Sequence, residues 1–495
     1  MPNPDGAFGR SLSRFGAVLV ELGDPLVDIV THLDIEDWLL EQGRDLMRSL
    51  FQDHLDLRAS RESRRADVVA VDEDRARTRV ECSHVRTLTT VFGQVVVERL
   101  AYRAPGSRNL YPADAVLGLP VGEHSHGLRR LAAIEATRGS FGQAAEAIGR
   151  ATGVGVGKRQ VEALAVATAG DLQAFYAGRC PGPCQDTVTL VLTFDGKGIV
   201  MRPDALRPGT AKAAAKADNK LATRLSRGEK ANRKRIAEVV AVYDAAPAPR
   251  ASGDVMARAG TEQAPAPKAT AKWLTASVEN DANSVVAAGF DEAERRDPTH
   301  RRTWIALVDG QAHQIKLVRA EAARRKVKVT IVCDFVHVLE YIWKAGWCFF
   351  AEGDKNIETW VADHARRILE GKAGIVAAAI RRKATTNHLE PAKRKNADTT
   401  ARYLMNLRSH LRYDTALAAG WPIATSVIEG AVRHLVKDRM DITGARWGLP
   451  GAEAILKLRA LVANGDFDAY WHFHVRQEQH RVHDARYRAN LTLAA

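Results

Sequence analysis

The stretch Thr189-Leu190-Val191-Leu192-Thr193-Phe194-Asp195 decides the fold of this chain. It is an apolar, β-branched run of strand length that ends in an aspartate, as a buried strand does at the edge of a sheet. We predict strands at 188–194, 236–243, 272–278, 303–308 and 328–333. Helix signals at 282–295 and 312–326 precede the fourth and fifth strands. The expected order is therefore β-β-β-α-β-α-β, an α/β core with a mixed five-stranded sheet.

Three acidic residues mark this core as a possible catalytic unit. Asp195 ends the first strand, Asp309 follows the fourth, and Glu429 opens a helical stretch over 428–435. Carboxylates are ligands for hard divalent cations, and two such ions can clamp the attacking and leaving oxygens of a phosphoryl transfer. Each acid alone is an ordinary turn or helix residue. Together with the strand order, which is that of the RNase H-like fold, they predict a catalytic triad that binds two Mg²⁺ or Mn²⁺ ions.

An Asp-x-x-His pair at the end of the fifth strand competes with this assignment. Asp334 is the main rival of Asp309 for the second ligand position, but strand order favours Asp309. We expect Asp334 and His337 to support the site from behind the ligands, or His337 to approach the scissile phosphate. The alternative is that His337 packs on the helix that follows.

The excess of basic residues in the chain indicates a polyanionic partner. The 495 residues contain 72 Lys and Arg against 59 acidic residues, a net charge of +13. Such an excess favours a polyanion, most simply nucleic acid, although a basic soluble surface is an equal alternative. Five scattered cysteines fit a reducing compartment, and no apolar run reaches 18 residues. With no signal pattern at residues 1–14, we expect a cytoplasmic, nucleoid-associated protein and no membrane contact.

The region before the core is predicted to be mostly helical and to bind DNA. We expect a helix over 23–60, a charged link over 61–84, and a β-hairpin at 85–99 with Gly93 in its turn. Two helices separated by a glycine-containing break follow in 141–170 and resemble a helix-turn-helix. Lys158 and Arg159, at the start of the second helix, are then DNA-contacting candidates. A plain helical hairpin is the alternative.

Two long segments interrupt or extend the core. A basic insertion at 202–235 ends in three candidate DNA contacts, although a solvated loop explains it equally well. A helical insertion is expected at 338–425. The candidates are Arg233, Lys234 and Arg235. The domain boundaries expected from these patterns are 1–84, 85–180, 185–337, 338–425, 426–465 and a histidine-containing surface tail at 466–495.

The segment after Glu429 supplies further candidates for phosphate or base contacts. Arg433 and Lys437 share a helix face with Glu429, and Arg439 follows them. Trp447 lies between glycines and can stack on a frayed base, while a core position is the more common role of a tryptophan. A solvated charged face is the alternative for the basic residues.

At this point four blocks carry a family resemblance. They are Leu192-Thr193-Phe194-Asp195-Gly196-Lys197-Gly198, Leu307-Val308-Asp309-Gly310, the Cys333–Tyr341 segment with Asp-x-x-His, and Val427–Met440. Over about residues 85–465 the chain resembles bacterial insertion-sequence transposases of the ISKra type, and the Asp-x-x-His is similar to that of Mutator-like DDE transposases.

The resemblance implies a DDE transposase with Asp195, Asp309 and Glu429 as its triad. It further implies binding to terminal inverted repeats and to target DNA, and assembly of a homo-oligomer on DNA. Three alternatives stay open: an RNase H-like nuclease without transposition, a helix-turn-helix regulator with an inactive core, and a tyrosine recombinase. A tyrosine recombinase would need a catalytic tyrosine near the end of the chain, and the sequence has no convincing candidate.

Overall fold

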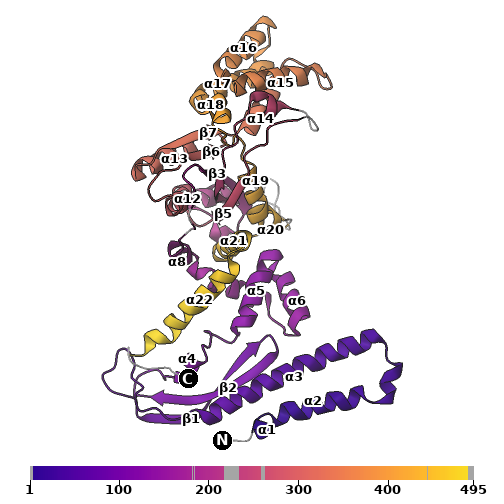
Figure 1. The fold of residues 1–495 in the computed structure, drawn as a ribbon, viewed down its shortest axis with the longest axis vertical. Helices are drawn as coiled ribbons and strands as arrows, with labels where there is room; N and C mark the ends of the chain where they lie inside the picture. The colour runs from indigo at the N-terminus through magenta and orange to yellow at the C-terminus, as the bar shows by residue number, and fades with distance from the viewer. Residues whose placement is uncertain are drawn as a thin grey trace. The chain divides into compact units, whose positions relative to one another are not determined.

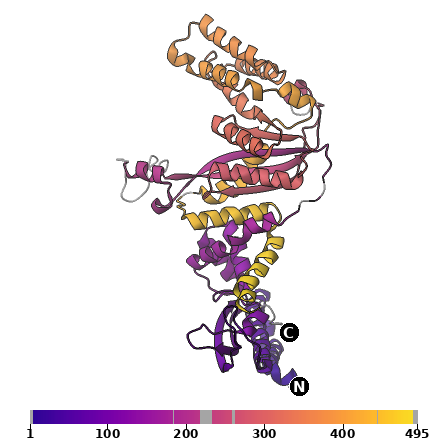
Figure 2. The ribbon, with the colours of Figure 1, turned by 90° about the vertical axis from the view of Figure 1, so that its left-hand side faces the viewer.

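The computed structural model describes residues 4–180, 182, 184–216, 233–257, 262–442 and 444–488. The chain divides into two compact units (Figures 1 and 2). One unit joins Met1–Gly178 to Gly465–Ala495, and the other is Arg179–Asn464. Residues 217–232 of the basic insertion lie outside the described residues. In the described ranges, no helix combines the length and the apolar character needed to cross a membrane.

The second unit is built on a mixed five-stranded sheet in the order β5-β4-β3-β6-β7. In this sheet β4 pairs antiparallel with both β3 and β5. Strand β6 pairs parallel with β3, and β7 pairs parallel with β6. The predicted five-stranded α/β core is confirmed. The strands are β3 (Thr189–Val200), β4 (Lys234–Ala245), β5 (Ala269–Ser277), β6 (Trp304–Val308) and β7 (Val329–Cys333).

Burial explains why these segments form strands. Every residue from Thr189 to Phe194 is buried, as is every residue of β6, so the unbroken apolar runs are those of a sheet covered on both faces. Helix α12 (Ala282–Arg296) packs closely on this sheet through Gly289, where a Cβ atom would lie 2.8 Å from Val240. Helix α13 (Ala312–Arg325) links β6 to β7, which completes the predicted β-α-β-α-β order.

A helical segment separates β7 from the helix that carries Glu429, as predicted. It docks on the sheet through Tyr413, whose hydroxyl donates to the carbonyl of Cys333 at 2.8 Å and whose ring meets Phe335 edge-on. The helices are α14 (Phe335–Gly346), α15 (Asn356–Leu369), α16 (Ala373–Thr386), α17 (Pro391–Asn406) and α18 (Tyr413–Ala418).

The chain then returns to the sheet. Glu453 of α21 is buried and accepts hydrogen bonds from Ser277 and from the N–H groups of Val278 and Glu279, which fixes α21 at the end of β5. The elements are α19 (Ser426–Val432), a π-helix (Arg433–Lys437), α20 (Asp438–Met440) and α21 (Leu449–Ala463). Shorter helices in this unit are α9 (Pro208–Ala215) and α11 (Ser252–Met256).

The first unit combines a β-hairpin with helices. Gly93 has φ +116° in the hairpin turn, which accounts for its place there. The elements are α1 (Pro4–Ala7), α2 (Gly9–Leu22), a 3₁₀ turn (Pro25–Ile29), α3 (His32–Arg61), β1 (Arg79–Thr90), β2 (Gly93–Arg103), α4 (Pro112–Val116), α5 (His126–Arg138), α6 (Phe141–Thr152), α7 (Lys158–Thr168), α8 (Leu172–Ala177) and α22 (Phe467–Val482).

The helix pair α6–α7 has the local signals that predicted it. Ser140 caps α6 in a capping box with Gln143, and Gly153 ends the helix with φ +72°. Both helices pack on α5. Lys158 and Arg159 are exposed in the first turn of α7, so they are available for a DNA contact, which stays a prediction.

Two expectations for this unit are wrong, and a third is confirmed with a different start. The helix expected over 23–60 is present as α3 but begins at His32. The segment 61–84 is more than a link, because Val68 and Ala70 are buried in a small core with Tyr102. The expected surface tail contains α22, whose residues Tyr470, Trp471 and His474 are buried.

Candidate active site

Sheet register places Asp195 beside Asp309. The parallel pairing of β3 with β6 brings Thr193 opposite Leu307, and each aspartate lies two residues beyond that pair. Neighbouring strands are about 4.8 Å apart, so the two carboxylates lie beside each other at the same level of the sheet. Both residues are half-buried. The two predicted aspartates are therefore close together, but Asp195 lies inside β3, which continues to Val200, and not at the end of the strand as expected.

The surroundings of the Asp195 carboxylate disfavour its negative charge. Burial raises the pKa of this carboxyl, and the negative charge of Asp309 raises it further, against His337 and Lys437. In the described part of the chain, the one hydrogen bond that its carboxylate accepts comes from the N–H of Gly196, at 2.6 Å. A half-buried carboxylate with one donor and a like-charged neighbour favours the arrival of a cation.

Asp309 is held in place more firmly. The backbone N–H of Gln311 donates to Oδ1 at 2.9 Å, and its side-chain amide donates to Oδ2 at 2.7 Å. Tyr403, stacked on Tyr341, donates from its hydroxyl to the carbonyl of Asp309 at 3.3 Å. Gly310 has φ +93°, and a Cβ there would lie 2.8 Å from Leu407. The helical insertion thus packs against the turn that aims Asp309.

A cavity of about 210 Å³ opens beside the two aspartates, and it contains residues that the sequence analysis missed. Glu238 lines it, and burial followed by the charge of Asp195 raises the pKa of Glu238. His313 and Gln314 line it from α13, and Gln314 donates to the carbonyl of Phe194 at 2.9 Å. The signal that could have identified Glu238 is a lone glutamate inside the apolar strand 236–243.

Asp334 is fully buried, and its carboxylate is occupied by protein donors. Oδ1 accepts from the N–H groups of Val336 (3.0 Å) and Thr425 (3.4 Å), and Oδ2 from His337 Nδ1 (2.9 Å) and Thr425 Oγ1 (2.7 Å). Burial alone would raise the pKa of Asp334, but the hydrogen bonds from His337 and Thr425 outweigh it and lower that pKa. Asp334 is therefore a poorer cation ligand than Asp309 in this arrangement.

The Asp334 cluster connects two parts of the site. His337, whose side chain is 37% exposed, gains its raised pKa first from the hydrogen bond to Asp334, and Asp309 contributes to the same shift. Thr425 stands directly before α19, the helix that carries Glu429. One buried carboxylate thus fixes both the imidazole beside the aspartates and the start of the glutamate helix.

Glu429 is exposed on α19, which packs on β3 and β4. Within the ranges that the structure describes, no three His, Cys, Asp or Glu side chains are grouped so that they could hold a metal ion. The structure therefore brings Asp195 and Asp309 together and does not gather Glu429 with them. The π-helix that follows Glu429 carries Lys437, whose charge lowers the pKa of Asp195.

The DNA-contact candidates near the core differ in exposure. Lys234, Arg433 and Lys437 are exposed, and Arg233 is half-buried. Arg235 instead donates to the backbone carbonyls of Val278, Ala205 and Glu279, so its guanidinium holds the insertion to the sheet.

Arg439 and Trp447 are wrong as DNA contacts in this structure, because both are buried. The Arg439 guanidinium lies 4.7 Å from the centre of the Trp447 ring, and burial lowers the pKa of Arg439 to about 10. The indole N–H of Trp447 donates to the carbonyl of Met440 at 3.1 Å. The core position left open for Trp447 is the one observed.

Comparison with known proteins adds no family assignment. No protein-family model matches the chain, and no curated protein matches its sequence.

Proposed function

We propose that this chain is the DDE transposase of an insertion sequence, with an RNase H-like catalytic core that cleaves and joins DNA. The observation that carries the proposal is the pair formed by Asp195, inside β3, and Asp309, directly after the parallel strand β6, with the pKa of Asp195 raised. Five strands in the sheet order third-second-first-fourth-fifth, with helices before the last two, support the RNase H-like assignment. The ISKra-type motifs support the narrower family.

The carboxylate pair fits a divalent cation, because its oxygens are hard ligands that the protein leaves short of donors. Mg²⁺ or Mn²⁺ held there would neutralise the charge on the phosphate oxygens and activate the attacking water or 3′-hydroxyl. Asp195 and Asp309 serve as ligands, and Gln311 keeps Asp309 in its orientation. Glu429, on α19, would be the third ligand of the set.

The remaining side chains orient the DNA. Asp334 binds Nδ1 of His337 and so directs the other ring nitrogen away from itself, where it can donate to a phosphate oxygen. Lys437, whose charge acts on Asp195, and Arg433 of the same π-helix are exposed and give charge for the DNA backbone. The α6–α7 pair, with Lys158 and Arg159 in front, is the part proposed to read the terminal inverted repeats.

The decisive experiment measures Mg²⁺- or Mn²⁺-dependent cleavage of DNA that carries the ends of the element. We expect Asp195→Asn, Asp309→Asn and Glu429→Gln each to lower the cleavage rate by about a thousandfold or more while end binding persists. Asp334→Asn is the matched control at a strand end, and we expect it to retain measurable cleavage.

Two results would redirect the assignment. Cleavage that survives Asp309→Asn and is lost in Asp334→Asn would move the second ligand to Asp334. Wild-type protein that binds one DNA sequence but never cuts would favour a regulator with an inactive core, and cutting without preference for the element's ends would favour a plain nuclease.

A further inference from the structure

An apolar hollow lies where α2 and α3 are joined. It has a volume of about 460 Å³, and its walls come from the end of α2, the 3₁₀ turn and the start of α3. Two of its side chains are unusually open to solvent, with Leu26 72% and Val30 41% exposed. The apolar lining consists of Leu22, Leu26, Val27, Val30, Ile35 and Trp38. Apolar side chains around a concave surface are typical of a binding site. We call this surface the tip hollow.

Local hydrogen bonds fix the shape of the tip hollow. Asp24 caps the 3₁₀ turn by accepting from the N–H of Leu26 at 2.9 Å. Thr31 caps α3 by accepting from the N–H of Asp34 at 3.2 Å, and its hydroxyl donates to the Asp34 carboxylate at 2.5 Å. The turn is therefore formed by polar groups, and its apolar side chains are in place before a ligand arrives.

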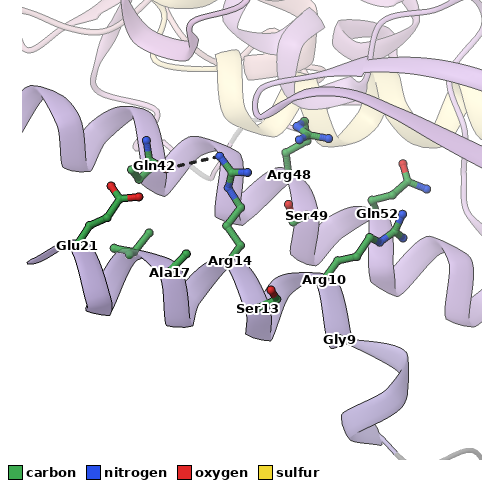
Figure 3. A pocket seen from close by; sticks show the side chains of 11 residues that line it. Gly9, Arg10, Ser13, Arg14, Ala17, Glu21, Gln42, Arg48, Ser49 and Gln52 are labelled. Carbon is green, nitrogen blue, oxygen red and sulfur yellow. Dashed lines mark hydrogen bonds between the residues drawn. The ribbon is translucent and has the colours of Figure 1, made fainter.

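Polar contacts outside the tip hollow join the two helices. Ser11 and Arg10 on α2 both donate to Asp53 on α3, at 2.6 and 2.8 Å. Figure 3 shows the polar cavity between the helices, where Arg14 donates to Gln42 at 3.5 Å. These contacts hold α2 on α3 without the residues of the tip hollow, which are thus available to another molecule.

The surroundings of the tip hollow are strongly acidic. Residues 21–38 contain six Asp and Glu and no Lys or Arg, a net charge of −6 (0 − 6, with His32 neutral) in a chain of +13. All six acids are exposed, and three of them line the hollow. They are Glu21, Asp24, Asp28, Asp34, Glu36 and Asp37. Such a surface repels DNA phosphates and anionic membranes, and it equally repels the tip hollow of a second copy. It attracts a ligand that carries positive charge beside its apolar groups.

We propose that the tip hollow binds a basic amphipathic helix of another protein. Apolar side chains spaced three and four residues apart on that helix enter the hollow, and Lys and Arg beside them meet the six acids. Charge complementarity of this kind speeds association and excludes partners of the wrong charge. This binding goes beyond the proposed DNA cleavage and does not depend on it.

Fluorescence anisotropy of a labelled synthetic peptide, added to the full-length protein without DNA, tests the proposal. The facial probe is a helix of about 18 residues with Leu along one face, at intervals of three and four, and Lys elsewhere. The scattered probe has the same composition, but its Leu residues are spread around the helix. We expect the wild type to bind the facial probe at least about tenfold more tightly, because the two probes differ only in the apolar face.

A variant without the apolar wall should lose this preference. Leu26→Ser/Val30→Ser removes two exposed apolar side chains and leaves the charge unchanged, so we expect both probes to bind it equally. The matched control is Ile375→Ser/Met405→Ser, because these residues are 61% and 37% exposed against 72% and 41% for Leu26 and Val30. We expect the control to bind both probes as the wild type does.

A charge variant tests the acidic surroundings, and it repeats the test if circular dichroism shows the first variant to be misfolded. Glu21→Gln/Glu36→Gln/Asp37→Asn removes three of the six charges and leaves the capping bonds of Asp24 and Asp34 intact. We expect the affinity for the facial probe to fall about tenfold at about 0.1 M NaCl, and the difference from wild type to shrink at about 0.5 M, where exposed charges are screened.

Four results would overturn the proposal. The first is equal binding of both probes by the wild type, and the second is a folded Leu26→Ser/Val30→Ser protein that keeps the preference. The third is a probe with Glu in place of Lys that binds as tightly as the facial probe. The fourth is sedimentation velocity in which the wild type dimerises and Leu26→Ser/Val30→Ser does not, which would assign the tip hollow to a second copy.

Discussion

Asp195 lies inside β3 and Asp334 directly follows β7, and the fold treats the two carboxylates in opposite ways. Asp334 is fully buried and accepts four hydrogen bonds, which lower its pKa. Asp195 is half-buried and, among the described residues, accepts one, from Gly196, and its pKa is raised. The same type of side chain has its hydrogen-bond acceptors filled in one case and is left short of donors in the other.

This difference distinguishes a carboxylate that stabilises the fold from one that is suited to bind a ligand. A buried carboxylate with all its acceptor positions filled stabilises the fold, since each donor it loses would be left unpaired. A carboxylate that is crowded by a second one and poorly solvated costs stability when ionised. That cost is tolerated where a ligand relieves it, and for this reason we propose that the pair Asp195 and Asp309, rather than Asp334, carries the chemistry.

The largest effect on stability is expected from removing the satisfied carboxylate. Asp334→Ala leaves Thr425, Val336 and His337 without their acceptor, and we expect a loss of about 3 kcal/mol. Asp195→Ala removes an unfavourable charge, and we expect a change within about 0.5 kcal/mol or a gain in stability at pH 7. Calorimetry of both variants beside the wild type measures the contrast, and equal losses would contradict it.

The sheet and the pair Asp195 and Asp309 could be predicted from the sequence, because they depend on runs of apolar residues that are local in the chain. Apolar stretches of strand length give the five strands. The position of Asp309 after the fourth strand gives its place beside Asp195, once that strand is taken as the parallel neighbour of the first. The extension of β3 past Phe194 was not predictable from apolar runs, since Gly196-Lys197-Gly198 continues to pair with β4 although it has no apolar pattern.

The parts that were missed depend on residues far apart in the chain. Ala70 pairs with Tyr487, more than 400 positions away, so neither the link nor the tail had a local signal. The donor that satisfies Asp334 is Thr425, 91 positions away. Spacing alone does not separate a saturated carboxylate from an open one, because the difference is made by these distant partners.

A smaller effect is expected on the imidazole that joins the two regions. Asp334→Asn removes the charge that stabilises the imidazolium, so the pKa of His337 should fall from its raised value toward the ordinary one near 6.5. Stability due to this pair is present below about pH 6.5 and is lost as pH rises through the raised pKa of the folded state. NMR titration of His337 in wild type and variant measures the shift, and identical curves would show that Asp334 does not control this histidine.

The smallest effect is expected at Gln311, which tests whether Asp309 belongs with the open carboxylate or the satisfied one. Its side-chain amide donates to Oδ2 of Asp309 at 2.7 Å while the backbone N–H keeps Oδ1 bound. Because one anchor remains and the site is partly solvated, Gln311→Ala should change stability by about 0.5 kcal/mol or less. Cation affinity, measured by isothermal titration with Mn²⁺, should fall by about tenfold, since the carboxylate loses its orientation. A stability loss comparable with that of Asp334→Ala, with unchanged Mn²⁺ affinity, would place Asp309 among the structural carboxylates and leave Asp195 without its partner.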